Sequence, residues 1–381
     1  MDGIARQVVA SGSDATEVAN KIVDGLAAPD LRLAFVFADW RLDPRVIAGT
    51  TYRGLKAPVI GASALGVIGV GVPIDGVSAV GLGLYGDWLK VGLGVATDLT
   101  KSALSRSRDA VSHAAADLGT TASALEASRH VAITLLDGTC GHEEAFCIGS
   151  AAAAPQIRFV GGCAATEIGS GRRAQIWVNG EVMTDAGVVA LLDSELPFHV
   201  VTSSHQMPTE TKTVVTAAHG RIIDELDGRP AAPRLRQLLA AVGDAVDEVR
   251  PAHSFARYID GVPYVRSLTQ IEGSRLHLAS AVESGHVLRV MRPGDLIGTT
   301  TRALALAAEK VGGSVAALLA FSCLGRHWDA EARGLERAHA AVYAAYPTVG
   351  MQTFGEQTGM LLVNHTLAGL AIGRYPTGGD R

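Results

Sequence analysis

The sequence predicts an α/β (mixed α+β) protein built from repeated strand–helix–strand–hairpin units with mixed sheets. Three observations predict it. First, three segments share a pattern in which two apolar residues precede a glycine and small residues follow. Second, an apolar run lies about 25–30 residues upstream of each glycine, a spacing that fits one helix with its two loops. Third, alternating apolar and polar residues follow downstream and predict antiparallel strands.

The three copies of the unit begin with the apolar runs "LRLAFVFAD", "HVAITLLDG" and "VAALLAFSC", each of which ends in polar groups. Such runs are typical of buried strands. The three glycines are Gly61, Gly161 and Gly350, within residues 57–66, 157–167 and 346–356. Because glycine has no Cβ, we expect the three glycines to lie at equivalent tight turns.

The connecting helix is clearest in the third copy. An apolar stripe with spacings of three and four residues predicts a single helix there and places His339 in the core. The stripe consists of Ala332, Leu335, His339, Val342 and Tyr346.

Two further segments complete the predicted elements. The "NGE" at Asn179–Glu181 predicts a hairpin with a type I′ turn. The stretch "TVVTAAHGRIIDELDGRPAAPRLRQLLAAV" predicts two strands joined by "AAHG" and then a helix, and a strand-rich stretch follows it. The "GLGLYG" at Gly81–Gly86 matches G-x-G-x-x-G, but a strand pattern follows it, so we interpret it as a glycine-spaced strand and not as a dinucleotide site.

Bulk composition narrows the class of protein. The chain has 381 residues, of which 48% are apolar and 19% charged, which predicts a sizeable globular core. A net charge of −5 argues against a nucleic-acid partner. The four cysteines and the lack of a signal-peptide pattern predict free thiols in a cytoplasmic setting. The uncharged residues 57–74 are rich in glycine, so we expect strands there and no membrane span.

The candidate site lies in "FSCLGRHW", residues 321–328, where a strand over Val315–Phe321 meets polar groups. The carboxyl ends of strands are where α/β sheets collect ligands, and "TFGEQTG" follows the next, parallel strand. Arg326 suits a carboxylate, and Glu356 suits an amine or pairs with Arg326. A structural ion pair between these two residues is the alternative interpretation. The predicted ligand-binding residues are Ser322, Cys323, Arg326, Glu356, Asn364, His365, Thr366 and Arg266.

Two other chemistries have weaker support. Cys323 and His327 could form a nucleophile–base pair, but no third orienting group and no Gly-x-Ser-x-Gly elbow accompany them. The "TCGHEEAFC" at Thr139–Cys147 offers cysteine and histidine without the spacing of a zinc site. Its acidic pair, Glu143 and Glu144, is typical of the first turn of a helix.

Taken in order, these motifs resemble FIST-domain proteins, a group of bacterial sensory proteins. "AFVFAD", "PVIGASALG", "FVGGCAAT" and "VNGEVMTDAGVVALL" are similar to the FIST N domain. "AFSCLGR", "PTVGMQTFGEQ" and "VNHTLAGLAI" are similar to the FIST C domain. The resemblance implies an N-terminal helical segment over residues 1–30, a FIST N domain over 31–212 and a FIST C domain over 213–381.

What the resemblance implies is ligand binding and signalling, not catalysis. The ligands proposed for the family are amino acids, and one branch binds haem and senses nitric oxide. For haem, His365 would be the first choice of axial ligand and His327 the second. We expect a stand-alone sensor whose partner is a histidine kinase or cyclase encoded separately. The ligand stays open because Val67 replaces the acidic residue found at Glu167 and Glu356. A hydrolase-like enzyme and a non-binding scaffold are the alternatives.

Overall fold

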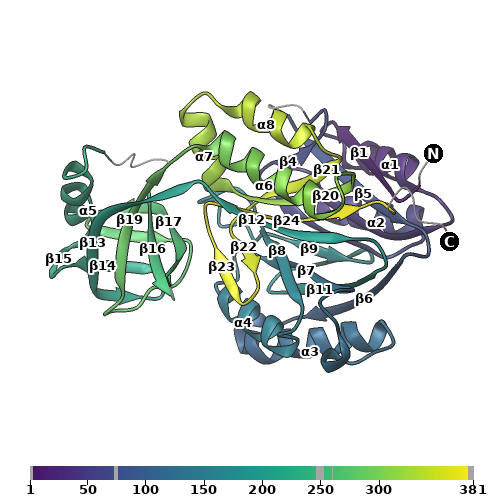
Figure 1. Cartoon of the computed structure of the whole chain (residues 1–381), viewed down its shortest axis with the longest axis horizontal. Helices are drawn as coiled ribbons and strands as arrows, with labels where there is room; N and C mark the ends of the chain where they lie inside the picture. Colours follow the sequence, from purple (N-terminus) through teal and green to yellow (C-terminus); the bar gives the residue numbers. More distant parts are fainter. Residues whose placement is uncertain (1–2, 73–75, 246–252, 260, 376–381) are drawn as a thin grey trace.

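The computed structural model describes residues 3–72, 76–245, 253–259 and 261–375. It has the predicted mixed α/β class, with four sheets divided between a body of three sheets and a separate strand-rich domain (Figure 1). The prediction of strands over residues 57–74 holds for the described part, since β3 and β4 lie there. No helix among the described residues is long and apolar enough to cross a membrane.

The three body sheets share one strand order, in which two parallel strands lie at the centre. The first sheet consists of β1 (Ala5–Ser11), β5 (Ser78–Tyr85), β2 (Leu31–Asp39), β3 (Val59–Ala64), β9 (Ile176–Val178) and β10 (Glu181–Met183). The second consists of β6 (Leu89–Ala96), β11 (Gly187–Ser194), β7 (His130–Asp137), β8 (Arg158–Ala164), β22 (Glu356–Thr358) and β23 (Leu361–Val363). The third consists of β12 (Phe198–Ser204), β24 (Thr366–Gly373), β20 (Val315–Cys323), β21 (Thr348–Thr353) and β4 (Val67–Gly69).

Each body sheet is completed by short strands that come from another copy of the unit. The β9–β10 hairpin pairs with β3, the β22–β23 hairpin pairs with β8, and β4 pairs with β21. The hairpin turn at Asn179 and Gly180 has positive φ at both residues, as a type I′ turn requires. Because each unit contributes short strands to the sheet of another unit, the three sheets form a closed ring. That the three units superpose stays a prediction.

The expectation that three glycines sit at turns is wrong. Gly61, Gly161 and Gly350 lie inside β3, β8 and β21, each opposite a residue of the parallel neighbouring strand. A Cβ at these positions would lie 1.9, 2.0 and 1.9 Å from the carbonyl oxygen of that residue. Glycine is therefore needed for the close approach of two strands and not for a turn.

The largest core cluster lies between the inner faces of the three sheets and includes Phe37, Ile133 and Phe321. Helices cover the outer faces: α3 and α4 lie on the second sheet, and α6 and α8 lie by the third (Figure 1). The body helices are α1 (Ala15–Leu26), α2 (Pro44–Leu55), α3 (Leu99–Asp117), α4 (Glu143–Ala153), α6 (Leu296–Lys310), α7 (Leu324–Ala332) and α8 (Glu336–Ala344), with a 3₁₀ turn at Ala122–Ala124. The first 30 residues thus contain β1 as well as α1.

The crossover of the third unit differs from the prediction. Strand β20 continues through Cys323, and α7 begins directly at Leu324, so the predicted polar turn is the first turn of a helix. The predicted single helix is two, α7 and α8, because Gly334 adopts a positive φ of 63° between them.

The strand-rich domain is inserted between β12 and α6 and has its own core. The boundary predicted at residue 212 falls inside its first strand. Two strands and then a helix lie here as expected, but Ala217, Ala218 and His219 belong to the first strand, and the turn is at Gly220 and Arg221. Its elements are β13 (Gln206–His219), β14 (Ile222–Leu226), β15 (Arg229–Pro230), α5 (Ala231–Ala240), β16 (Ser254–Ile259), β17 (Val262–Glu272), β18 (Arg275–Leu278) and β19 (Val287–Pro293).

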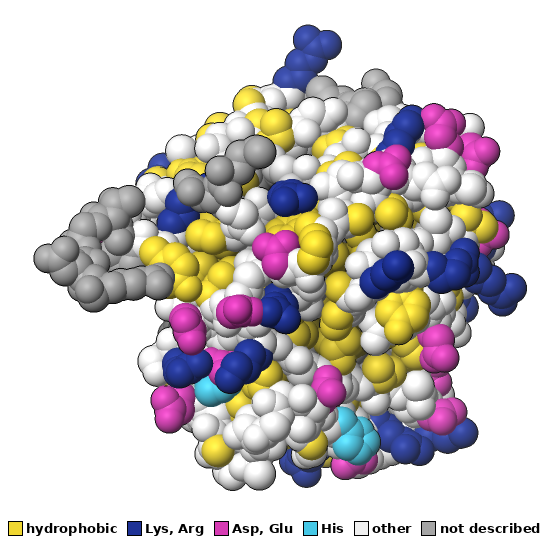
Figure 2. Space-filling view, turned by 90° about the vertical axis from the view of Figure 1, so that its right-hand side faces the viewer, with side chains coloured by type: hydrophobic (Ala, Val, Ile, Leu, Met, Phe, Trp, Pro, Cys, Tyr) yellow, Lys and Arg dark blue, Asp and Glu magenta, His cyan; other side chains and the backbone are white. Residues whose placement is uncertain are grey.

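The face of the body opposite the strand-rich domain carries charges of both signs (Figure 2). Basic and acidic side chains are spread around hydrophobic ones on this face, with no continuous basic area. The mixture of signs agrees with the small net charge of −5.

Candidate functional site

Four of the residues predicted from the sequence are fully buried around the carboxyl end of β20. They are Arg326, Glu356, Asn364 and His365, each with 0% exposure. Such burial is unusual for charged side chains, and each needs partners within the protein.

The Glu356 carboxyl is buried beside the Thr353 hydroxyl, the Cys323 thiol and the backbone N–H of Thr366. The Thr353 hydroxyl donates to Oε1, while Oε2 is buried without a hydrogen-bond donor. Burial raises the pKa of Glu356 well above its ordinary value, against the opposing effects of the Thr353 hydroxyl and the Arg326 charge. Burial therefore favours the protonated, neutral form of this carboxyl.

Glu356→Gln is expected to make stability less dependent on pH. A raised folded pKa means that the stabilisation from Glu356 is complete below its unfolded pKa near 4.5 and is lost as pH rises through the folded pKa. Glutamine stays neutral, so as pH rises from about 5 the free energy of unfolding of the variant should increase relative to that of wild type by up to about 1.4 kcal/mol per pH unit, until the pH passes the folded pKa of Glu356. Urea denaturation at several pH values above 5 measures this difference in the free energy of unfolding. Glu167→Gln, at an exposed position, is the control. If the free energy of unfolding of Glu356→Gln and of wild type changes with pH in the same way, Glu356 is not a buried neutral acid.

Arg326 does not form the ion pair with Glu356 that the sequence left open. Its Nε donates to Ser322 Oγ at 3.2 Å and its Nη2 to Thr300 Oγ1 at 2.6 Å, and both acceptors are neutral. Nη1 has no hydrogen-bond partner, and within the described residues no carboxylate oxygen lies within 4.0 Å of the guanidinium. The charge of Arg326 is thus buried without a counter-ion.

Asn364 and Arg266 join the body to the strand-rich domain. Oδ1 of Asn364 accepts from the Ser267 N–H at 3.3 Å and from the Ser280 hydroxyl at 2.8 Å. Arg266 donates to the Leu362 carbonyl at 3.1 Å. Thr366 donates to the backbone of Asn364 and lines a separate 690 Å³ groove. These contacts serve the domain junction.

His365 does not fit a haem. The side chain is enclosed, and a Cβ on Gly325 would lie 2.6 Å from Cε1 of the imidazole, which shows how closely the backbone covers the ring. Burial lowers the pKa of His365 to about 3, so the imidazole is neutral. None of the described cavities is lined by His365, so a macrocycle has no space next to its Nε2.

Two cavities flank the end of β20. The interface cavity, of 380 Å³, lies between the body and the strand-rich domain. Its lining includes Thr139, Glu167, Arg172, Cys323, Leu324 and Trp328 of the body and Arg221, Ser267, Thr269, Leu278 and Ala279 of the strand-rich domain. The helix-side cavity, of 360 Å³, lies by α8 and includes Asp39, Arg41, Ser322, His327, Glu336, His339, Tyr343 and Gln352 in its lining.

Cys323 and His327 do not form a nucleophile–base pair. Cys323 lines the interface cavity, whereas His327 lines the helix-side cavity. Burial raises the pKa of Cys323, so its thiol stays protonated and unreactive. The polar and charged walls around His327 do not fit a haem either.

Cys140 and Cys147, in the second copy of the repeated unit, do not belong to a described group of metal-binding side chains. Within the described residues, no group of three or more His, Cys, Asp or Glu side chains is placed to hold a metal ion. Cys140 and Cys147 are buried free thiols, and Glu143 and Glu144 open α4 as expected.

Of the ligand-binding residues predicted from the sequence, Cys323 alone lines the interface cavity. Thr139 follows β7 and Glu167 follows β8, at the same strand ends in the second unit that Cys323 and Glu356 occupy near β20 and β21 in the third. The internal repeat carried this signal. The repeat gave no such indication for Arg172. The guanidinium of this residue lies 5.3 Å from the centre of the Trp40 ring.

Two family models match the chain, and the boundary between them lies inside the strand-rich domain, at the start of α5. The FIST N domain family matches residues 30–229, and the FIST C domain family matches residues 231–358. An uncharacterized protein of Methanocaldococcus jannaschii is 33% identical over 84 residues, which are 22% of this chain and 16% of that protein. The chain therefore matches only a small part of that relative's length.

Solved structures give weak likenesses. Cyanuric acid hydrolase from A. caulinodans has a TM-score of 0.35 at 12% identity, over 97% of this chain and 99% of that chain. PurLQS from Thermotoga maritima has a TM-score of 0.18 at 12% identity, over 98% of this chain and 73% of that chain. Neither likeness bears on function.

Proposed function

The chain belongs to the FIST family, whose domains are associated with sensory signal transduction and small-ligand binding, and from this premise we propose that it senses an amino-acid-like molecule bound in the interface cavity. One observation carries the proposal: the walls of this cavity come from both the body and the strand-rich domain. Ligand pockets occur preferentially at such junctions.

The lining supports an amino-acid-like ligand. The Arg172 guanidinium suits a carboxylate, and the Glu167 carboxylate suits an amine. Arg221 contributes less charge because it is bound to Glu143 and Glu144. Leu324 and Trp328 provide an apolar wall for a side chain. A zwitterion with an apolar substituent meets all of these groups.

A ligand in this position would act on the junction between the domains. The hydrogen bonds of Asn364 with Ser267 and Ser280 lie on the same side of the body. A ligand that binds one arrangement of the two domains better than another shifts the population toward it. We propose that a separately encoded histidine kinase or cyclase detects that shift.

Titration with the individual common amino acids tests the proposal. We expect at least one of them to change the emission of Trp328, which lines the cavity, and to release or absorb heat in calorimetry. The fluorescence change should be lost in Trp328→Phe and kept in Trp88→Phe, because Trp88 lies in the core and does not line this cavity.

A cavity-filling variant controls for binding elsewhere. Ala279→Phe should abolish the heat of binding, whereas Ala127→Phe, at an exposed position outside the cavity, should leave it unchanged. The proposal fails if no amino acid binds, or if a bound amino acid is retained by Ala279→Phe.

A further inference from the structure

Arg326 presents a buried charge that the protein leaves uncompensated. The guanidinium makes two hydrogen bonds to hydroxyls and none to a carboxylate among the described residues, and Nη1 has no partner. An isolated buried ion is costly unless it is paired. A charge of this kind beside a cavity is the arrangement expected for an anionic ligand.

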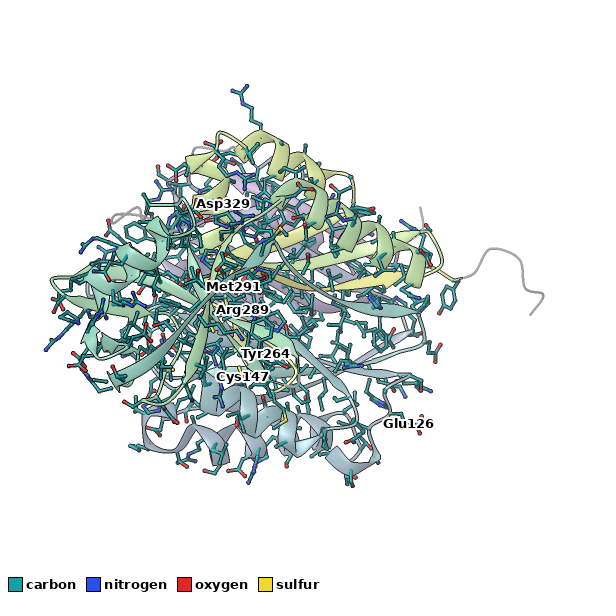
Figure 3. The ribbon with its side chains drawn as sticks, turned by 60° about the vertical axis from the view of Figure 1, so that its left-hand side comes forward. Glu126, Cys147, Tyr264, Arg289, Met291 and Asp329 are labelled. Carbon is teal, nitrogen blue, oxygen red and sulfur yellow. The ribbon has the colours of Figure 1, made fainter. Side chains whose placement is uncertain are left out.

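The carboxylates near Arg326 have other roles. Asp329 of α7, labelled in Figure 3, lies 2.9 Å from the Arg333 guanidinium and 3.1 Å from Nε2 of His205. Asp39 is bound by two nitrogens of Arg41 at 2.8 and 2.6 Å. Glu356 is held as the neutral acid. The surroundings of Arg326 therefore keep one positive charge in excess.

The floor of the helix-side cavity is built from hydrogen-bonding groups next to that charge. Ser322 Oγ accepts from Arg326 Nε, and it also accepts from the Tyr343 hydroxyl at 3.3 Å. His339 is 7% exposed, packs edge-on against Tyr343 at 5.1 Å between ring centres, and has an Nε2 without a partner. Three polar groups thus meet at one end of a 360 Å³ space.

We propose that the helix-side cavity binds a small carboxylate, with its anionic group on the floor beside Ser322, Tyr343 and His339 and with the Arg326 charge behind it. Ser322 and His339 can each donate a hydrogen bond to an oxyanion, and the Tyr343 hydroxyl can do so by turning its proton from Ser322 Oγ to the ligand. A singly charged anion fits better than phosphate, because Arg326 supplies a single positive charge behind the floor and the Glu336 carboxylate in the cavity wall repels a second negative charge. This site is separate from the interface cavity and does not depend on the sensory proposal.

The binding test uses sodium acetate, sodium lactate and sodium benzoate as probes, with sodium chloride and sodium phosphate as references at equal ionic strength. We expect at least one carboxylate to raise the melting temperature above that in chloride and to bind in calorimetry. Tyr343→Phe should weaken that binding about tenfold or more through loss of one hydrogen bond to a charged group. Tyr346→Phe is the matched control, since Tyr346 lies outside the cavity lining.

Arg326→Met separates a ligand site from a structural role. We expect the variant to melt no lower than wild type without ligand, because it removes a buried unpaired charge, and to show no response to the carboxylate. Ala279→Phe should leave the carboxylate response unchanged, which distinguishes this site from the interface cavity.

Four results would overturn the proposal: no response to any of the three carboxylates, equal or tighter binding of phosphate, unchanged binding by Tyr343→Phe, or loss of the response in Ala279→Phe. A marked fall in the melting temperature of Arg326→Met, together with a carboxylate response that the variant keeps, would assign Arg326 a purely structural role.

Discussion

Gly350→Ala is expected to abolish the folded state. The added Cβ would lie 1.9 Å from the carbonyl oxygen of Ala320 on the parallel strand β20, and that oxygen belongs to the backbone of the middle strand of the third body sheet. A flexible side chain could move aside, but here two hydrogen-bonded strands must separate. Overpacking of a core typically costs about 1–3 kcal/mol, and a clash between backbones should exceed that range. Soluble yield and thermal unfolding followed by circular dichroism measure the loss.

Gly49→Ala is the matched control for this change. Gly49 lies within α2 with a helical backbone, and a Cβ there would meet only the terminal atoms of Arg53 at 3.1 Å. Alanine replaces glycine inside a helix with a gain of about 0.5–1 kcal/mol. Replacing glycine by alanine should therefore stabilise the protein at residue 49 and unfold it at residue 350. A Gly350→Ala protein that melts near the wild-type temperature would contradict the close pairing of β20 and β21.

Arg221→Ala is expected to lower the free energy of unfolding by about 3–5 kcal/mol, as found when a buried charge loses its partner. Arg221 lies at the turn between β13 and β14 and donates to Glu143 and Glu144 at the start of α4. Glu143 is 1% exposed, and its other hydrogen bond is from the Gly141 N–H at 3.1 Å. Without Arg221 its carboxylate is left in the junction between body and strand-rich domain. Urea denaturation measures the change.

Two further variants test the cause. Arg229→Ala, at an exposed residue of the same domain, should stay within about 0.5 kcal/mol of wild type. Adding Glu143→Gln to Arg221→Ala should recover most of the loss, since the buried charge is then removed. If Arg221→Ala alone matches wild type, the ion pair does not hold the junction together.

Local patterns in the sequence identified much of the fold. The apolar runs predicted strands β2, β7 and β20. The spacing to the next apolar pair predicted the parallel neighbours of these strands, β3, β8 and β21. The Asn179–Gly180 pair gave a hairpin turn, because few residues other than asparagine and glycine accept positive φ. Glu143 and Glu144 marked the start of α4. Each of these signals depends on residues close together in the chain.

The candidate site shows where local patterns stop being sufficient. The sequence grouped Ser322 and Cys323 because they are adjacent at the end of one strand. Neighbouring side chains of a strand point to opposite faces, so Ser322 opens to the helix-side cavity and Cys323 to the interface cavity. Which face meets which cavity depends on elements from elsewhere in the chain: α8 on one side and the strand-rich domain on the other.

The sequence by itself determined the class of fold, the order of most elements and the strand end at which polar groups collect, because hydrophobic period and turn chemistry are local properties. Only the tertiary structure decided that hairpins complete one another's sheets and that Arg326 stands apart from Glu356. Glu356 is opposite Gly162 and Arg326 bonds to Thr300, contacts that exist only once distant segments pack together. The energy of a buried charge is set by that packing and not by the residue that carries it.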